Sequence, residues 1–224
     1  MSEPVNGPPT RPALPGAAIG FCGKLPARGD FVSIGLPRGF VEPWHDWMQR
    51  MLAASRVVLG EDWLAAWNVA PIWRFALPPG DCGPDAVLGL WMPSIDRVGR
   101  QFPLTFAAVA AESDIAALIR DNGGFLARAE TAGLDAIAAG LDPGDVVVRL
   151  AAEDSSLDGA AGIAPEFRPC EGALWWSTAC NTVCSSGATG VTEFATPGLP
   201  DAETFTRMLQ PGKSVGEAEC PRPC

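Results

Sequence analysis

The sequence contains no tyrosine and only one histidine, His45, among its 224 residues. A metal centre built on histidine needs more than one histidine ligand. A serine nucleophile of the triad type needs a histidine within hydrogen-bond reach. His45 stands beside Trp44, away from the centre of the apolar face that this segment would present as a helix. We therefore interpret His45 as a surface or half-buried residue rather than a catalytic one.

Basic residues are also scarce, since 16 Lys and Arg stand against 26 Asp and Glu and the net charge is −10. Nucleic acid is therefore not an expected partner, because phosphate backbones bind basic faces. No apolar run reaches the ~20 residues that cross a bilayer, so we expect no membrane insertion. The first residues, MSEPVNGPPTRPALPG, lack the basic start and apolar stretch of a secretory signal. We expect a cytoplasmic protein.

The seven cysteines are odd in number, and nothing in the chain suggests export, so we expect reduced thiols. Cys180 and Cys184 have a spacing within the loose range of zinc ligands, and so have Cys220 and Cys224. That spacing alone is a weak signal, and we expect no metal and no cofactor.

What the chain does have is core material: 47% of it is hydrophobic, with eight Trp and ten Phe. Its central stretch holds two apolar runs, which predict buried strands over Ala86–Met92 and Phe102–Val109. Between them lies the polar insert PSIDRVGR, residues 93–100, which starts with a strand-ending proline and contains a glycine that permits positive φ. We predict a tight loop on two rigid strands, a position where function tends to be found.

A second polar turn, over residues 26–30, follows a predicted strand that begins at Ile19. We predict that this turn and the central loop lie on one side of the domain, where two roles are open. They form a partner site, because arginine forks pair with carboxylate or phosphate groups, or their carboxylates and cations only brace the two loops, which is the role we favour. The candidates for either role are Lys24, Arg28, Asp30, Ser94, Asp96, Arg97 and Arg100.

Gly23-Lys24 is not part of a phosphate-binding P-loop. That motif has a glycine five residues before the Gly-Lys pair and a Ser or Thr after it. Ala18 and Leu25 occupy those places.

Periodicity and turn residues predict the rest of the chain as one α/β domain over residues 19–210, with disordered segments at 1–18 and 211–224. Strand 71–77 is expected beside strand 86–92 in antiparallel orientation. The other expected elements are helices at 43–59, 61–67, 113–119, 125–139 and 201–209, an ambiguous segment at 146–150, a strand at 172–178, and loops at 151–169 and 181–192.

Trp175 and Trp176 are neighbours in a predicted strand and must point to opposite faces of its sheet. Either Trp176 is exposed at an interface, where tryptophan is enriched, or helices cover both faces. We favour the covered strand, and we keep Trp176 among the partner-binding candidates.

Three segments together resemble the TagF family, accessory proteins of bacterial type VI secretion. They are GFCGKLPARGDFV at residues 20–32, MPSIDRVGRQFPL at 92–104, and LWWS at 174–177 followed by GLP at 198–200. The resemblance spans about residues 19–210 in the family's order. It departs locally at Cys22, where an aromatic residue is common, and in the loop at 181–192.

The resemblance implies a cytosolic, non-enzymatic α/β protein that represses type VI secretion after translation by binding a forkhead-associated scaffold protein of the apparatus. Some members carry a fused protein-phosphatase domain, for which this chain has no room, so a phosphatase would be a separate protein. From layering and pattern we expect a single-domain three-layer α/β/α sandwich with a mixed, largely antiparallel sheet. The alternatives are a structural subunit of the secretion machine and a hydrolase that uses Ser94, Asp96 and the arginines.

Overall fold

The computed structural model describes residues 17–110, 123–152, 172–177 and 192–210. The expectations for the two chain ends, helix 113–119, most of loop 151–169, loop 181–191 and Cys180, Cys184, Cys220 and Cys224 lie outside these residues. The elements are β1 (Ala17–Gly23), β2 (Val32–Ile34), α1 (Arg38–Leu59), η1 (Gly60–Asp62), α2 (Trp63–Val69), β3 (Trp73–Leu77), β4 (Ala86–Met92), β5 (Leu104–Ala110), α4 (Gly123–Ala139), α5 (Pro143–Ala151), β6 (Ala173–Ser177), β7 (Thr192–Thr196) and α6 (Ala202–Met208).

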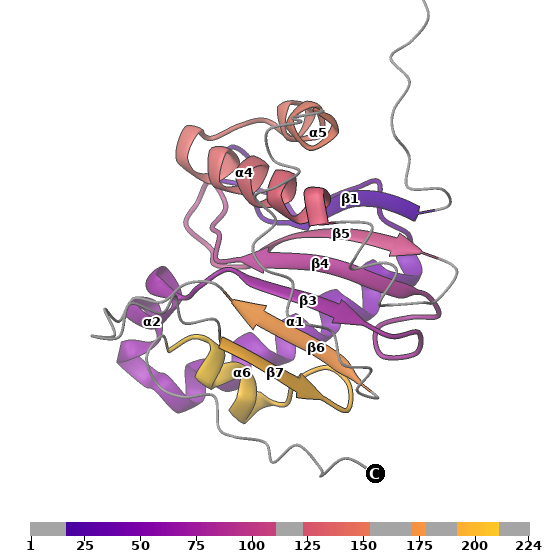
Figure 1. The fold of residues 1–224 in the computed structure, drawn as a ribbon. Helices are drawn as coiled ribbons and strands as arrows, with labels where there is room; N and C mark the ends of the chain where they lie inside the picture. Colours follow the sequence, from indigo (N-terminus) through magenta and orange to yellow (C-terminus); the bar gives the residue numbers. More distant parts are fainter. Residues whose placement is uncertain (1–16, 111–122, 153–171, 178–191, 211–224) are drawn as a thin grey trace, which may run out of the picture.

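The strands form one seven-stranded sheet in the order β2-β1-β5-β4-β3-β6-β7 (Figure 1). Strands β3, β4 and β5 are joined as consecutive hairpins. Strand β1, earlier in the chain, pairs with β5, and strand β6, later in the chain, pairs with β3. Every described pair is antiparallel. This confirms the α/β class and the antiparallel pairing of β3 with β4. We expected a mixed sheet, but no described pair is parallel. Parallel neighbours need a crossover connection, and none joins two neighbouring strands of this sheet.

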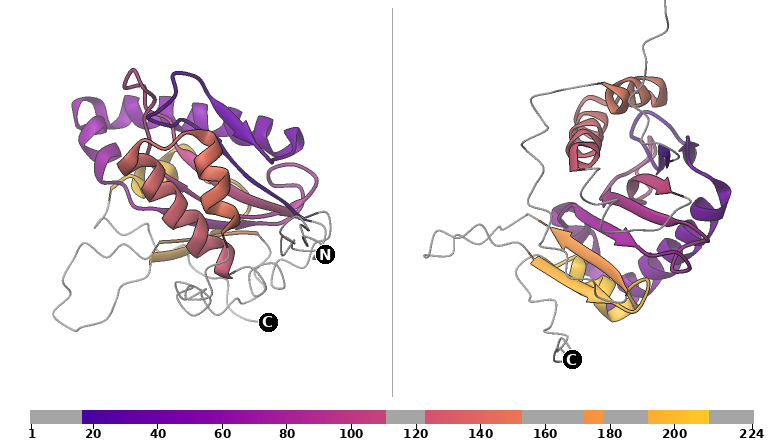
Figure 2. Two further views of the ribbon diagram at one scale, coloured as in Figure 1. Left: turned by 90° about the horizontal axis from the view of Figure 1, so that it is seen from above. Right: turned by 45° about the vertical axis from the view of Figure 1, so that its right-hand side comes forward.

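Helices cover both faces of the sheet, with α1, α2 and α6 on one side and α4 and α5 on the other (Figures 1 and 2). The side chains of the central strands alternate between two cores, one under each helical layer. In β6, Trp175 belongs to the core under α1 and Trp176 to the core under α4, and both are fully buried. The covered-strand interpretation is therefore confirmed.

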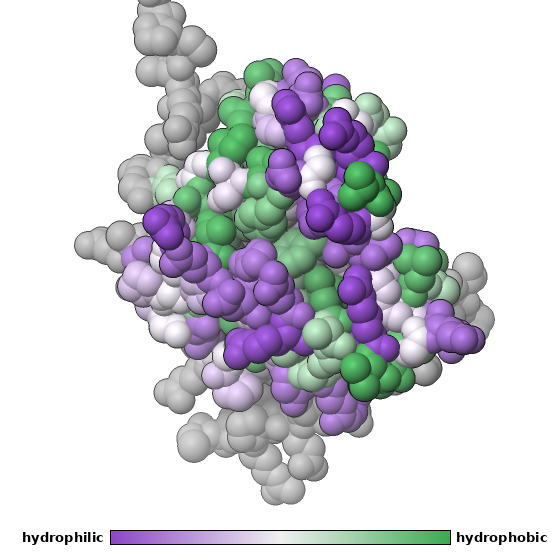
Figure 3. Space-filling model, turned by 180° about the vertical axis from the view of Figure 1, so that it is seen from behind, coloured by the Kyte–Doolittle hydropathy of each residue, from purple (hydrophilic) through white to green (hydrophobic). Residues whose placement is uncertain are grey.

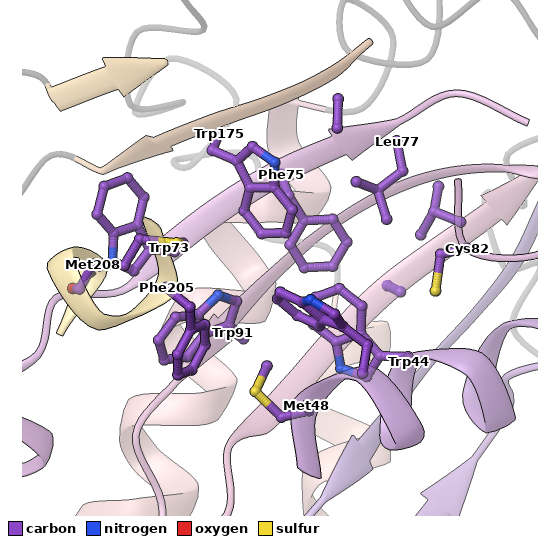
Figure 4. Packing of buried hydrophobic residues seen from close by; sticks show 14 of the residues in the cluster. Trp44, Met48, Trp73, Phe75, Leu77, Cys82, Trp91, Trp175, Phe205 and Met208 are labelled. Atoms are coloured by element: carbon purple, nitrogen blue, oxygen red, sulfur yellow. Dashed lines mark hydrogen bonds between the residues drawn. The ribbon is translucent and has the colours of Figure 1, made fainter. Parts of the chain in front are cut away.

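The core under α1 is built from stacked aromatic rings (Figure 4). Trp44 of α1 stacks on Phe75 of β3 with ring centroids 4.6 Å apart, and its indole N–H donates to Thr105 Oγ1 at 3.0 Å. Two further indole N–H groups fix the C-terminal part of the chain: Trp47 donates to the Pro200 carbonyl at 2.9 Å and Trp73 to the Met208 carbonyl at 3.0 Å. The last helix is therefore part of this core.

Helix α1 begins at Arg38 and contains Pro43 in its interior, so the start that we predicted at Pro43 is wrong. Proline favours the first turn because it has no N–H to donate, but it can also stand further along a helix at the cost of one hydrogen bond, as Pro43 does here. The added turn is held by Pro37, whose carbonyl accepts bonds from Phe40 and Val41 N–H, and by the buried Phe40 ring. The end at Gly60, with φ +53°, is as predicted.

Other elements also differ from the sequence pattern: β5 begins at Leu104 rather than at Phe102, and α2 spans Trp63–Val69 rather than residues 61–67. Strand β1 begins at Ala17, two residues before Ile19, because Ala17 and Ala18 pair with Ala110 and Val109 of β5. The ambiguous segment at 146–150 is helical and belongs to α5. Strand β7 was not predicted, since its residues are mostly exposed and carry no apolar alternation.

Candidate functional site

The two polar turns meet at one end of the sheet, as the sequence predicts (Figure 1). Strand β1 ends at Gly23 beside Leu104, the first residue of β5, and β4 enters the central loop from the same end. Gly23 has φ +133°, and a Cβ there would lie 2.0 Å from the Pro103 carbonyl oxygen. Only glycine allows this close approach. We call residues 24–30 the first turn and residues 94–101 the hairpin tip.

The hairpin tip extends the β4–β5 hairpin beyond the sheet. Ile95 and Gln101 form an isolated antiparallel bridge, and Phe102 N–H donates to the Ser94 carbonyl at 3.1 Å. Gly99 closes the turn at φ +84°, with its N–H bonded to the Asp96 carbonyl at 2.9 Å. The loop is therefore a defined turn rather than an irregular connection.

Asp96 organises both turns from a buried position, with a side chain that is 0% exposed. Its Oδ1 accepts bonds from the backbone N–H of Val98 at 3.0 Å and of Arg100 at 2.9 Å. Its Oδ2 accepts Lys24 Nζ at 2.5 Å and Arg100 Nε at 2.6 Å. One carboxylate thus shapes the hairpin tip and ties it to the first turn.

The surroundings of Asp96 favour its charged form. Burial by itself would raise the pKa of the Asp96 carboxyl, but the hydrogen bonds from Lys24, Arg100 and the Val98 N–H outweigh it and hold that pKa well below its ordinary value. The Asp96 carboxyl is therefore ionised at neutral pH.

Three more hydrogen bonds join the turns. Ser94 Oγ donates to the Lys24 carbonyl at 2.8 Å, Arg97 N–H donates to the Arg28 carbonyl at 2.9 Å, and Arg100 Nη2 donates to the Gly29 carbonyl at 2.5 Å. Lys24, Ser94 and Asp96 thus have the bracing role that was one of our two interpretations. Arg100 braces with one edge of its guanidinium while 62% of its side chain stays exposed.

The remaining candidates lie on the surface. Arg28 pairs with Asp142, the residue before α5, at 3.2 Å, and both side chains are more than half exposed. Asp30 and Arg97 are exposed as well. Val98, between Arg97 and Gly99, is an apolar side chain that is 67% exposed. Trp176 is 0% exposed in the core under α4, so it contributes to the fold and not to a contact surface.

Sequence reasoning missed the part of α1 that borders the hairpin tip. Arg56 Nη2 donates to Gln101 Oε1 at 3.3 Å, and the Arg56 guanidinium lies 4.2 Å from the ring centroid of Trp63. Helix α1 lies behind the sheet in Figure 1, and the view from behind shows hydrophilic residues interspersed with hydrophobic ones (Figure 3). No local signal links Arg56 to a loop 45 residues away.

Among the described residues, the surroundings of Ser94 and His45 do not form a catalytic arrangement. Ser94 is buried, and its hydroxyl donates to backbone carbonyls, so no base activates it within the described part of the chain. His45 is half-buried, as predicted, with its ring against Phe31 and Phe102 and one ring nitrogen 3.3 Å from Gln49 Nε2. The described residues therefore present no nucleophile–base pair at these positions.

The described cysteines also lack reactive character. Cys22 and Cys82 are free thiols in the core under α1. Burial, the larger cause in each case, raises the pKa of both thiols to about 12. Such thiols are neither nucleophiles nor metal ligands at neutral pH. Across residues 17–110, 123–152, 172–177 and 192–210, no His, Cys, Asp and Glu side chains form a group of three or more that could hold a metal ion.

None of the helices in the described ranges has both the length and the apolar character needed to cross a membrane.

Comparison with known proteins finds a family model and solved structures that match this chain. The family model of the TagF N-terminal domain, described as type VI secretion system-associated, matches residues 20–152, which include both turns. The crystal structure of PA0076 from Pseudomonas aeruginosa PAO1 is 34% identical, with a TM-score of 0.68 over 92% of this chain and 99% of that chain. A search of curated proteins found no match. The chain therefore belongs to the TagF family of proteins associated with type VI secretion.

Proposed function

We propose that this protein is a non-enzymatic, cytoplasmic regulator that holds bacterial type VI secretion off after translation by binding a forkhead-associated scaffold protein of the apparatus. Membership of a family associated with type VI secretion supports the biological setting. The observation that carries the mechanism is the use of Ser94 and Asp96 as internal braces. Side chains committed to holding a surface turn favour recognition of another protein over chemistry on a substrate.

The brace has a property that suits a binding protein. Loops lose conformational freedom when they bind, and a loop that is already fixed avoids this cost. The hairpin tip is fixed by Asp96 from inside and by the first turn from the side, while its outer residues face solvent. We infer that the turns are pre-organised to dock against a partner.

The deciding experiment is a pull-down with the purified scaffold as bait. Cell cytosol that contains the full-length wild-type protein is passed over immobilised scaffold, with an unrelated forkhead-associated domain as control bait. We expect the immobilised scaffold to retain the protein and the control domain not to retain it. We also expect premature secretion in a strain that lacks the protein. Wild-type protein that flows through the scaffold column would exclude the repressor mechanism proposed here.

A structural subunit of the secretion machine is the second candidate. It predicts that the protein sediments with assembled secretion particles, whereas a regulator stays with the soluble scaffold. The hydrolase alternative predicts that a phosphonate probe labels Ser94 and that Ser94→Ala removes the label. We expect neither result, because Ser94 Oγ is buried and donates to the Lys24 carbonyl.

A further inference from the structure

We propose that the scaffold is contacted through an arginine surface made of Arg56, Ile95, Arg97, Val98 and Arg100, and that this surface fits a protein patch rich in Asp and Glu side chains. The inference rests on the proposed function and names the contact residues and the chemistry of the partner. It separates these residues from Lys24, Ser94 and Asp96, which hold the surface from beneath.

The local charge runs against that of the whole chain. The two turns and the side chains that bond to them carry five cationic groups, Lys24, Arg28, Arg56, Arg97 and Arg100, and three carboxylates, Asp30, Asp96 and Asp142. The chain as a whole has a net charge of −10. A positive region on an acidic protein attracts an acidic partner.

Two of these arginines, Arg56 and Arg97, keep their charge unused within the described part of the protein. Arg56 lies over Trp63 and touches Gln101. Arg97 follows Asp96 in the fixed turn, and its side chain is exposed. Neither Arg56 nor Arg97 has an ion-pair partner among the residues that the structure describes. Arg56, held over Trp63 with its charge unpaired, loses little freedom when it binds a carboxylate, and the fixed backbone of Arg97 sets where its guanidinium can reach.

Two apolar side chains lie among these cations. Val98 is 67% exposed at the outermost point of the turn, and Ile95 is 39% exposed beside Gln101, the residue that Arg56 touches. A mixture of arginine and aliphatic side chains on one rigid turn is typical of the surface that one folded protein presents to another.

The backbone favours carboxylates over a phosphate group. Phosphate sites commonly use a cluster of free backbone N–H groups. At the hairpin tip the N–H groups of residues 96–100 are already bonded: Asp96 N–H to the Arg100 carbonyl, Arg97 N–H to Arg28, Gly99 N–H to Asp96, and the N–H groups of Val98 and Arg100 to Asp96 Oδ1. This turn therefore offers side-chain guanidinium groups rather than backbone N–H groups, and guanidinium groups pair well with Asp and Glu.

The test measures binding of the full-length protein to the purified scaffold by biolayer interferometry, with Arg56→Glu plus Arg97→Glu as the main variant. Arg100 is left intact because it braces Asp96. The matched control is Arg38→Glu plus Arg207→Glu, which changes the net charge equally at one exposed and one half-buried helix position. We expect the main variant to weaken binding about tenfold or more and the control to leave it unchanged.

Two further arms make the outcome decisive. Val98→Asp alters one exposed side chain without touching the braces, and it should also weaken binding, so the inference survives a main variant that fails to fold by circular dichroism. Scaffold treated with phosphatase should bind as well as untreated scaffold, and loss of binding there would refute the carboxylate assignment. Wild-type binding with all variants equal to the control would overturn the arginine surface and leave the proposed function standing. No wild-type binding would overturn both.

Discussion

At the scale of single residues, Asp96 determines the shape of the site. Two backbone N–H groups, an ammonium and a guanidinium converge on this one buried carboxylate. The sequence indicates the loop and its charged residues, because proline, glycine and ionisable groups interrupt two apolar runs. It does not indicate that Lys24 is the partner of Asp96, since the two are 72 positions apart and several arginines are nearer in the chain.

Asp96→Asn should destabilise the protein in a pH-dependent way. The folded state lowers the pKa of this carboxyl, so its charge stabilises the fold above the unfolded pKa of about 4, and that contribution is lost as pH falls through the folded pKa. In urea unfolding we expect a lower midpoint for the variant at pH 7, a somewhat smaller difference from wild type at pH 3, and a further narrowing as the pH falls below 3.

The exposed Asp46, with a side chain that is 77% exposed, provides the control. Asp46→Asn should shift the urea midpoint little at either pH. A gap between Asp96→Asn and wild type that is as wide at pH 3 as at pH 7 would contradict the role of the Asp96 charge.

At the scale of elements, α4 packs very close to the sheet because of Gly133. A Cβ at this position would lie 2.5 Å from Met92 Cε and 2.9 Å from Phe106 Cε2. Met92 and Phe106 belong to β4 and β5, the strands that carry the hairpin tip. A glycine inside a helix usually reduces its stability, so the close packing explains its presence here.

Gly133→Val should destabilise the protein by about 1–3 kcal/mol, the usual cost of overfilling a packed core. Urea unfolding followed by tryptophan fluorescence measures the effect. The control is Ala138→Val, at an exposed position of α4, which also places a β-branched residue in the helix but not in the packed interface with the sheet. The difference between the two variants therefore measures the clash at residue 133. Equal stability of the two variants would mean that α4 is not pressed against the sheet.

Periodicity predicted the elements that bury one face and failed for those that do not. The apolar stripe of α1 and the runs of β4 and β5 were found because side chains must follow the periods of helix and strand. Strand β7 has little buried surface, and the first turn of α1 is decided by Phe40 packing rather than by the Pro43 signal. The contacts of Arg56 with Gln101 and of Arg28 with Asp142 join segments that are distant in the chain. They depend on how the elements pack in space, which local sequence patterns do not contain.

At the scale of the whole molecule, the fold extends beyond the region that the family model matches. That region ends at residue 152, yet β6 and β7 extend the sheet and α6 fills the core under α1. Trp175 packs against Trp44 and Phe75, and Phe205 packs against Trp47 and Trp91. We propose that residues 19–210 are the folding unit, as the sequence pattern suggested.

A chain that ends at residue 152 should therefore fail to fold cooperatively, because aromatic rings that are buried in the full chain would be exposed. Size-exclusion chromatography and thermal unfolding by circular dichroism measure this. A chain that ends at residue 210 keeps every described element and should unfold like the full-length protein. A sharp unfolding transition in the shorter chain would show that β6, β7 and α6 are dispensable.

Every one of the eight tryptophans is at most 5% exposed, and the chain has no tyrosine. Intrinsic ultraviolet emission therefore comes from the interior and reports whether the interior is intact. A partner docked on the arginine surface touches this set of indoles only through Arg56, which lies over Trp63. Unfolding should therefore change the emission of all eight tryptophans, whereas association should change that of Trp63 alone.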